Sequence, residues 1–203
     1  MKTTFITLTI LELIDTAIDA FKNIFLEYDS EMCSTANNDK TKIYRNNTGA
    51  YFCVLCKSFG DKKPSFREFF QNIFYVGKGM HDRCFQHLEL VQDMVGNLDK
   101  DDVKGNIIAN NWRNGMGIYV VSGFHCSTNE ESFNREAAVI DCIGLDKLTN
   151  KIKGTKYGNI VKWNDIKTYN YGMFLLYTLY LKFINENIKC IYCNDISPKK
   201  NIK

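Results

Sequence analysis

The residues best suited to chemistry lie in one short stretch, where a phenol, a guanidinium and an imidazole surround two glycines. Tyr75 comes just before Gly77 and Gly79, and Arg83 and His87 follow them. Glycines let a backbone turn sharply and approach a ligand closely, and an arginine has a planar fork of donors suited to a phosphate. The stretch therefore indicates a site that handles phosphate groups.

The same stretch resembles the signature of the GIY-YIG endonuclease family. Residues 74–79 read FYVGKG, and residues 75–77 stand in the place of the YIG half of the signature. Upstream, residues 49–51 resemble the GIY half, and Arg83 stands where the family has its arginine. The two halves occur in the order that the family requires.

Two downstream segments extend this resemblance. Residues 134–141, NREAAVID, are similar to the helix that supplies the family's metal-binding glutamate, and residues 148–150, LTN, to the loop that supplies its asparagine. The resemblance runs from about Gly49 to about Gly158. These motifs are similar to those of the subgroup that includes the animal ankyrin-repeat and LEM-domain nucleases and similar bacterial proteins.

The resemblance implies an α/β (α+β) fold, with a small, mainly antiparallel three-stranded sheet flanked by helices. We expect this nuclease-like core at residues 49–160. An N-terminal helical extension and linker would occupy residues 1–48, and a C-terminal helical extension residues 161–203. The apolar spacing of the first segment and the apolar, aromatic run from Tyr169 to Ile184 predict these added helices.

The resemblance also implies a function: metal-dependent hydrolysis of DNA phosphodiester bonds, with Mg²⁺ or Mn²⁺ as the cofactor and branched or structured DNA as the suggested substrate. The implied catalytic residues are Tyr51, Tyr75, Arg83, His87, Glu136 and Asn150. Glu136 would be the metal ligand, because one carboxylate with waters and substrate oxygens suits Mg²⁺. The expected DNA contacts are Lys78, His81, Lys151, Lys153 and Lys156.

The first half of the signature leaves two alternatives open. Residues two apart on a strand share a face, so Cys53 can occupy the place of the catalytic phenol instead of Tyr51. A thiol there would put activity in doubt. The rival function is a catalytically inactive module of the same fold that binds nucleic acid or another protein, and the long insertion between the two half-signatures also favours it.

The elements that must position these residues follow from the apolar pattern. The apolar run from Tyr51 to Cys56 and the run from Ile73 to Val76 predict two strands, joined by a long connection over residues 57–71. Helical spacing after the glycines places Arg83 and His87 on one stripe of a helix.

A third strand is predicted at residues 115–121. It includes the letters GIY at 117–119, which come after the second half-signature, so we assign Tyr119 to packing. Thr128 or Ser127 can cap the next helix, which should end at Gly144.

Composition gives weaker guidance. The chain has 203 residues, 45% of them hydrophobic, with a net charge of +3. This is ordinary for a globular protein and requires no overall attraction to nucleic acid. Between residues 147 and 167, however, the sequence contains six lysines and a single aspartate. This local positive charge favours contact with phosphates.

The eight cysteines do not by themselves indicate a disulfide scaffold in a chain this long. Cys190 and Cys193 have the spacing of a zinc half-site, which stays open. The N-terminus lacks a signal-peptide pattern and the run from Tyr169 to Ile184 is too short to span a membrane. We expect an intracellular protein, nuclear or cytoplasmic, with no membrane partner.

Overall fold

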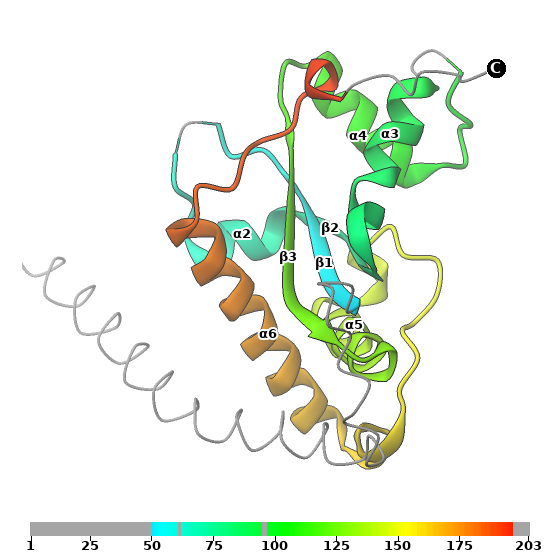
Figure 1. Cartoon of the computed structure of the whole chain (residues 1–203), viewed down its shortest axis with the longest axis vertical. Helices are drawn as coiled ribbons and strands as arrows, with labels where there is room; N and C mark the ends of the chain where they lie inside the picture. The colour runs from blue at the N-terminus through cyan, green and yellow to red at the C-terminus, as the bar shows by residue number, and fades with distance from the viewer. Residues whose placement is uncertain (1–49, 61, 95–96, 197–203) are drawn as a thin grey trace, which may run out of the picture. The chain divides into compact units, whose positions relative to one another are not determined.

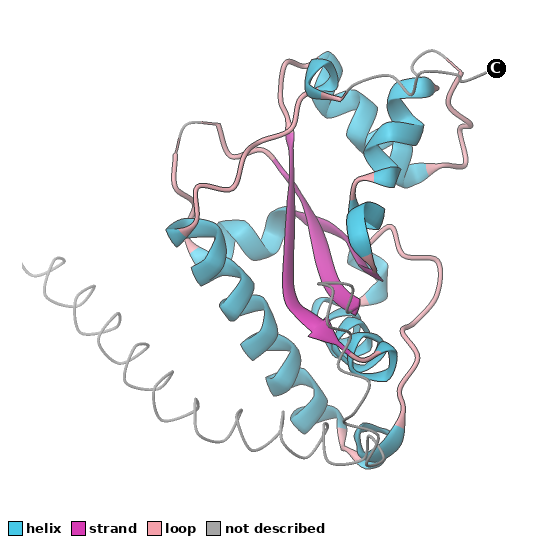
Figure 2. Cartoon of the chain, viewed as in Figure 1, coloured by secondary structure: helices cyan, strands magenta, loops and turns pink. Residues whose placement is uncertain are grey.

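The computed structural model describes residues 50–60, 62–94 and 97–196. Its centre is a three-stranded sheet in the order β2-β1-β3, built from β1 (Ala50–Lys57), β2 (Ile73–Gly79) and β3 (Ile118–Ser127). Both strand pairs are antiparallel (Figure 2). The predicted fold class is confirmed, whereas the helix predicted within residues 1–48 lies outside the described part of the chain.

Helices cover both faces of this sheet. Figure 1 shows α3 (Gln86–Asp93) and α4 (Val103–Arg113) on one side and α6 (Asp165–Asn185) on the other. Side chains alternate along β1, so Tyr51, Cys53 and Leu55 enter the apolar cluster that α3 and α4 complete. The long helix α5 (Asn129–Ile143) packs against α6 and against all three strands.

Local sequence explains the ends of α5. The Thr128 hydroxyl accepts a hydrogen bond from the Glu131 backbone N–H, and the Glu131 carboxylate accepts one from the Thr128 N–H, which makes a capping box. Gly144 follows the helix with φ 94°, a conformation that favours glycine. The predicted limits of this helix are confirmed.

The apolar face of α6 anchors the C-terminal part of the core. Tyr171, Leu175, Leu176 and Leu179 are almost completely buried, and each such side chain contributes roughly 1.5–3 kcal/mol of transfer free energy. The predicted buried helix from Tyr169 to Ile184 is thus confirmed and extended. Among the described helices, none is both long enough and apolar enough to cross a membrane.

The connection between β1 and β2 contains a helix that we did not predict, α2 (Phe66–Asn72). Ser65 and Glu68 form a capping box at its start. The Phe66 ring meets the ring of Tyr177 edge-on, with 5.3 Å between centroids, and Phe69 is fully buried. Aromatic packing on α6 therefore stabilises what the sequence suggested was only a connecting segment.

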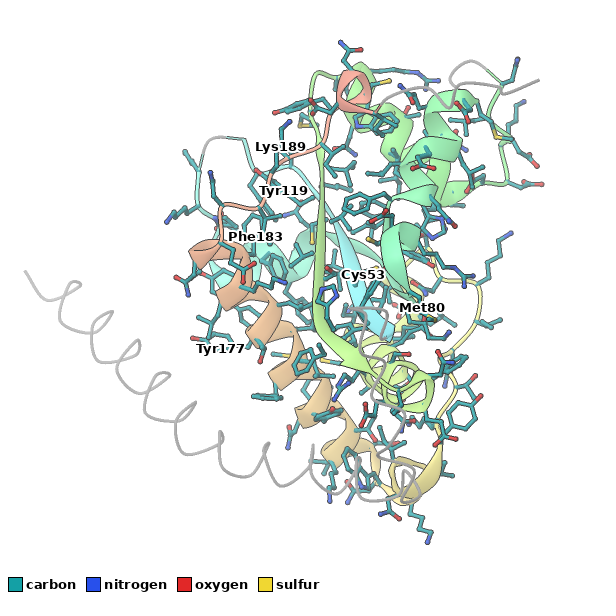
Figure 3. The ribbon with its side chains drawn as sticks, in the orientation of Figure 1. Cys53, Met80, Tyr119, Tyr177, Phe183 and Lys189 are labelled. Carbon is teal, nitrogen blue, oxygen red and sulfur yellow. The ribbon has the colours of Figure 1, made fainter. Side chains whose placement is uncertain are left out.

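Strand β3 lies further along the chain than predicted, running to Ser127. Tyr119 packs its ring edge-on against Phe183 of α6, with 4.9 Å between centroids (Figure 3). This is the packing position that we expected. Four short 3-10 helices complete the described elements: η2 (His81–Cys84), η3 (Leu145–Lys147), η4 (Gly158–Lys162) and η5 (Cys193–Asp195).

Candidate active site

A cleft of about 670 Å³ lies among α3, α4, α5 and the loop 148–155. Four of the predicted catalytic residues line it: Tyr75, His87, Glu136 and Asn150. They come from β2, α3, α5 and the loop, four segments that are far apart in the sequence. The fold thus brings most of the predicted site together in one place.

Glu136 is one of three carboxylates that line this cleft, with Asp101 and Asp102. It projects from the middle of α5 and is half-buried, and burial raises its pKa to about 7. The positive charges of Lys78 and Arg83 oppose that shift. A carboxylate held in this way among cations can accept a metal ion or interact with a proton near neutral pH.

Tyr75 lies beside it at the start of the glycine pair. Burial raises the pKa of this phenol to about 12, with further contributions from Cys53 and Glu136, while Arg83 acts in the opposite direction. A Cβ atom at Gly77 would lie 2.8 Å from Cε1 of the Tyr75 ring and 3.0 Å from its hydroxyl. A side chain at position 77 would therefore force the Tyr75 ring to move.

Arg83 is exposed and does not share a helix with His87, contrary to our expectation. It lies in η2, where Asp82 leaves helical geometry (φ −85°, ψ 15°), and α3 begins only at Gln86. A Cβ atom at Gly79 would lie 3.0 Å from Cβ of Arg83. The second glycine thus lets this short helix lie close to β2. Arg83 does not line the cleft, but its charge acts on Glu136 and Tyr75.

His87 contacts a residue that sequence reasoning missed. Lys104, in the first turn of α4, places Nζ 3.0 Å from Nδ1 of His87 and 4.1 Å from the centroid of the Tyr75 ring. Asp102, which caps α4 by accepting from the Gly105 N–H, could have indicated the helix. Nothing in the sequence marked the lysine itself.

Asn150 fixes the edge of the site. Its Oδ1 accepts from the Val76 N–H at 3.0 Å, and its Nδ2 donates to the Val76 carbonyl at 2.7 Å. Thr149 adds two hydrogen bonds to the Phe74 carbonyl, one from its backbone N–H and one from its hydroxyl. The loop is therefore held to the backbone of β2 on both sides of Tyr75.

The two alternatives for the first half-signature differ sharply in position. Tyr51 is 3% exposed, and its hydroxyl accepts a hydrogen bond of 2.9 Å from the Cys84 N–H. Cys53, mid-strand in β1 (Figure 3), pairs with Gly77, and its thiol is electrostatically coupled to Glu136. The register therefore favours Cys53 over Tyr51 as the first-strand residue facing the cleft residues.

Burial governs both of these side chains. It raises the pKa of the Tyr51 phenol and of the Cys53 thiol well above their ordinary values. Both groups are therefore protonated at neutral pH.

Replacing Tyr51 by phenylalanine should lower the free energy of unfolding by about 1–2 kcal/mol, because the Cys84 N–H loses its buried acceptor. Urea denaturation measures this change. The matched control is Tyr169→Phe, which removes a hydroxyl from an exposed ring on α6. Equal stability of the two variants would mean that the Tyr51 hydroxyl does not serve this structural bond.

The predicted DNA-contacting residues are dispersed. Lys151 and Lys153 are exposed and line the cleft. Lys156 instead forms a 2.7 Å ion pair with Asp141, and the Lys78 ammonium lies 3.6 Å from the centroid of the Phe133 ring. The side chain of His81 lies outside the described part of the structure.

The predicted metal ligand, Glu136, is not part of a larger cluster of metal-binding side chains among the described residues. Within residues 50–60, 62–94 and 97–196, no group of three or more histidine, cysteine, aspartate or glutamate side chains could hold a metal ion. Cys53 and Cys56 are buried, and Cys190 and Cys193 are partly exposed thiols. A cysteine cage is thus not formed by the described residues, whereas Glu136 has the oxygen donors that Mg²⁺ prefers.

Comparison with known proteins gives consistent matches. Human ankyrin repeat and LEM domain-containing protein 1 is 29% identical over 135 residues, covering 64% of this chain and 22% of that protein. The Caenorhabditis elegans homolog is 36% identical over 111 residues, covering 53% and 16%, and the mouse protein 31% over 135 residues, covering 64% and 25%. This chain thus spans a quarter or less of the length of these relatives.

No solved structure gives a significant match to the chain. Residues 38–198 match the family described as the LEM-3-like GIY-YIG domain. That range includes every predicted catalytic residue and the whole described sheet. The chain therefore belongs to the LEM-3-like GIY-YIG family of nuclease domains.

Proposed function

We propose that the chain is a metal-dependent endonuclease that hydrolyses DNA phosphodiester bonds. The observation that carries this proposal is the position of Glu136, half-buried in a cleft beside Tyr75, His87 and Lys104 and electrostatically coupled to Arg83. Phosphodiester hydrolysis needs charge stabilisation at the phosphate and at the leaving oxygen. The cations of the cleft and a metal ion on Glu136 suit that need.

The donor set fits Mg²⁺ or Mn²⁺. Glu136 would hold the ion, since Mg²⁺ commonly takes one or two carboxylates and completes its shell with water and phosphate oxygens. When bound, such an ion would neutralise charge on the phosphate and favour departure of the leaving oxygen.

The chain's own residues supply the remaining functions. Arg83 would grip a phosphate with its planar fork, and the Tyr75 phenol, protonated at neutral pH, would donate a hydrogen bond to the attacking water or to the phosphate. Asn150 keeps Tyr75 in place through Val76. Lys151 and Lys153, both exposed at the cleft, would follow the DNA backbone.

We further propose that the substrate is branched or otherwise structured DNA. The subgroup resemblance supports this choice, and so does an apolar strip along the cleft formed by the exposed side chains Leu90, Met94 and Val103. The lysines of loop 148–155 suit phosphates. The bases of a regular duplex stay stacked, however, and cannot pack against the strip. Bases that are unstacked at a junction would pack against this strip. Proteins that open base steps use apolar side chains in the same way.

The test is a cleavage assay on the full chain. We expect it to cut a four-way junction or a flap at least about 10-fold faster than a linear duplex of equal length, since the strip binds only unstacked bases. Cutting should require Mg²⁺ or Mn²⁺ and stop with chelator. Equal rates on both DNAs would reject the branched substrate, and cutting that persists in chelator would reject the metal.

One observation favours a second candidate, the catalytically inactive DNA-binding module. The first half-signature offers a buried thiol at Cys53, and the Tyr51 hydroxyl is occupied by the Cys84 backbone. DNA binding without any metal-dependent cutting in the assay above would support that candidate. The substitution Cys53→Tyr would then show whether a phenol at that position restores cutting.

A further inference from the structure

Three side chains from three elements form a cluster in the cleft: Tyr75 of β2, His87 of α3 and Lys104 of α4. The Lys104 ammonium lies 3.0 Å from Nδ1 of His87, 3.4 Å from Nε2 and 4.1 Å from the centroid of the Tyr75 ring. The rings of Tyr75 and His87 meet edge-on, at 77° and with 4.9 Å between centroids. Lys104 is thus in contact with both of its neighbours.

The position of Lys104 is costly for a residue with no function. It is half-buried, and burial lowers the pKa of its ammonium. Among the described residues, no carboxylate forms an ion pair with it. The charge of Asp102 acts on the ammonium and opposes this shift, without an ion pair. A partly desolvated cation whose nearest partners are an imidazole and a π face is unusual as a structural device.

The contact defines the protonation of His87. Nζ of Lys104 lies almost equally close to the two ring nitrogens, so the ammonium sits over the ring and not in line with the lone pair of either nitrogen. A cation in this position opposes the addition of a second proton to the ring. Burial, together with the charges of Lys104 and Arg83, lowers the pKa of His87 to about 4, while Asp102 acts in the opposite direction.

We propose that Lys104 is a positioning residue of the active site, which holds His87 as a neutral ring, edge-on to the Tyr75 ring. His87 then donates a hydrogen bond to a phosphate oxygen of the substrate and does not take a proton from water. This inference rests on the proposed nuclease function. Its first test does not depend on activity.

The first test is nitrogen NMR of the histidine rings. The chain has three histidines, and His87→Gln identifies the signal of His87. We expect a neutral ring at pH 6, and in Lys104→Met a pKa of His87 raised by about one unit or more, toward 6.5. A ring that titrates near 6.5 in the unmodified chain, or that is unchanged in Lys104→Met, would overturn the proposal.

The second test separates positioning from simple phosphate binding. Lys104→Met should lower kcat on the branched DNA by roughly 10- to 100-fold with little change in KM, because a misplaced donor affects mainly the transition state. Lys104→Arg, which keeps a positive charge beside His87, should recover part of the loss. Lys153→Met, at an exposed position in the same cleft, should instead raise KM.

An effect of Lys104→Met confined to KM, like that of Lys153→Met, would make Lys104 a phosphate contact and contradict the proposal. If the unmodified chain cuts no DNA, the proposed function fails. The NMR measurement then still decides whether Lys104 keeps His87 neutral.

Discussion

Replacing Glu136 by glutamine is expected to lower metal-dependent DNA cleavage by about 100-fold or more. Glutamine has nearly the same shape but no negative charge, and Glu136 is the carboxylate buried beside Tyr75. The variant should still bind DNA, because Arg83 and the exposed lysines of the loop 148–155 are unchanged. Single-turnover cleavage in Mg²⁺, beside a binding assay in chelator, measures the two properties separately.

The matched control is Glu130→Gln, an exposed position in the first turn of the same helix. It removes the same charge from α5 outside the cleft and should leave cleavage within about twofold, because a surface charge contributes little. Cleavage that survives undiminished in Glu136→Gln would show that this carboxylate does not hold the metal.

The same variant has a stability effect whose sign follows from the pKa. Folding raises the pKa of Glu136 from 4.5 to about 7, so the folded state holds this proton better than the unfolded state. Stability is therefore lost as pH rises from about 4.5 through 7. In chelator, Glu136→Gln should be more stable than the unmodified chain by roughly 3 kcal/mol at pH 8, and the difference should vanish near pH 4.

Most of the fold could be predicted from local sequence patterns. The apolar runs of β1 and β2 and the capping residue of α5 are local signals, and each was confirmed. The missed helices, α2 and α4, each have a capping residue, Ser65 and Asp102. Their apolar stripes are short, because each helix buries only a few side chains, so the periodicity was too weak to outweigh the glycine and polar residues around them.

The site was predictable only where the family signature is literal. Cys53, and not Tyr51, lies opposite Gly77 because of how β1 and β2 pair. Both residues are on the same face of β1, so the sequence alone cannot show which of them pairs with Gly77. Lys104 reaches Tyr75 because α4 packs beside α3. A tertiary contact of this kind has no trace in local sequence.

Gly172 shows the same limit in the core, because the sequence presents it only as an interruption in an apolar run. In the structure it lies where α6 crosses α5. A Cβ atom at this position would lie 2.5 Å from Cβ of Cys142 and would overlap the backbone carbonyl of Ala138. A backbone carbonyl cannot rotate away as a side chain does, so α5 itself would have to move.

We therefore expect Gly172→Val to lower the free energy of unfolding by about 3 kcal/mol or more, at the upper end of overpacking effects. Gly172→Ala should cost less, since the better helix propensity of alanine offsets about 1 kcal/mol. Thermal and urea unfolding measure both, with Ile166→Val on the exposed face of α6 as the control. A Gly172→Val variant as stable as this control would mean that the two helices are not in contact there. Because Glu136 lies two residues before Ala138 on α5, a displaced helix should also shift the carboxylate, and cleavage should fall even in the fraction of molecules that stays folded.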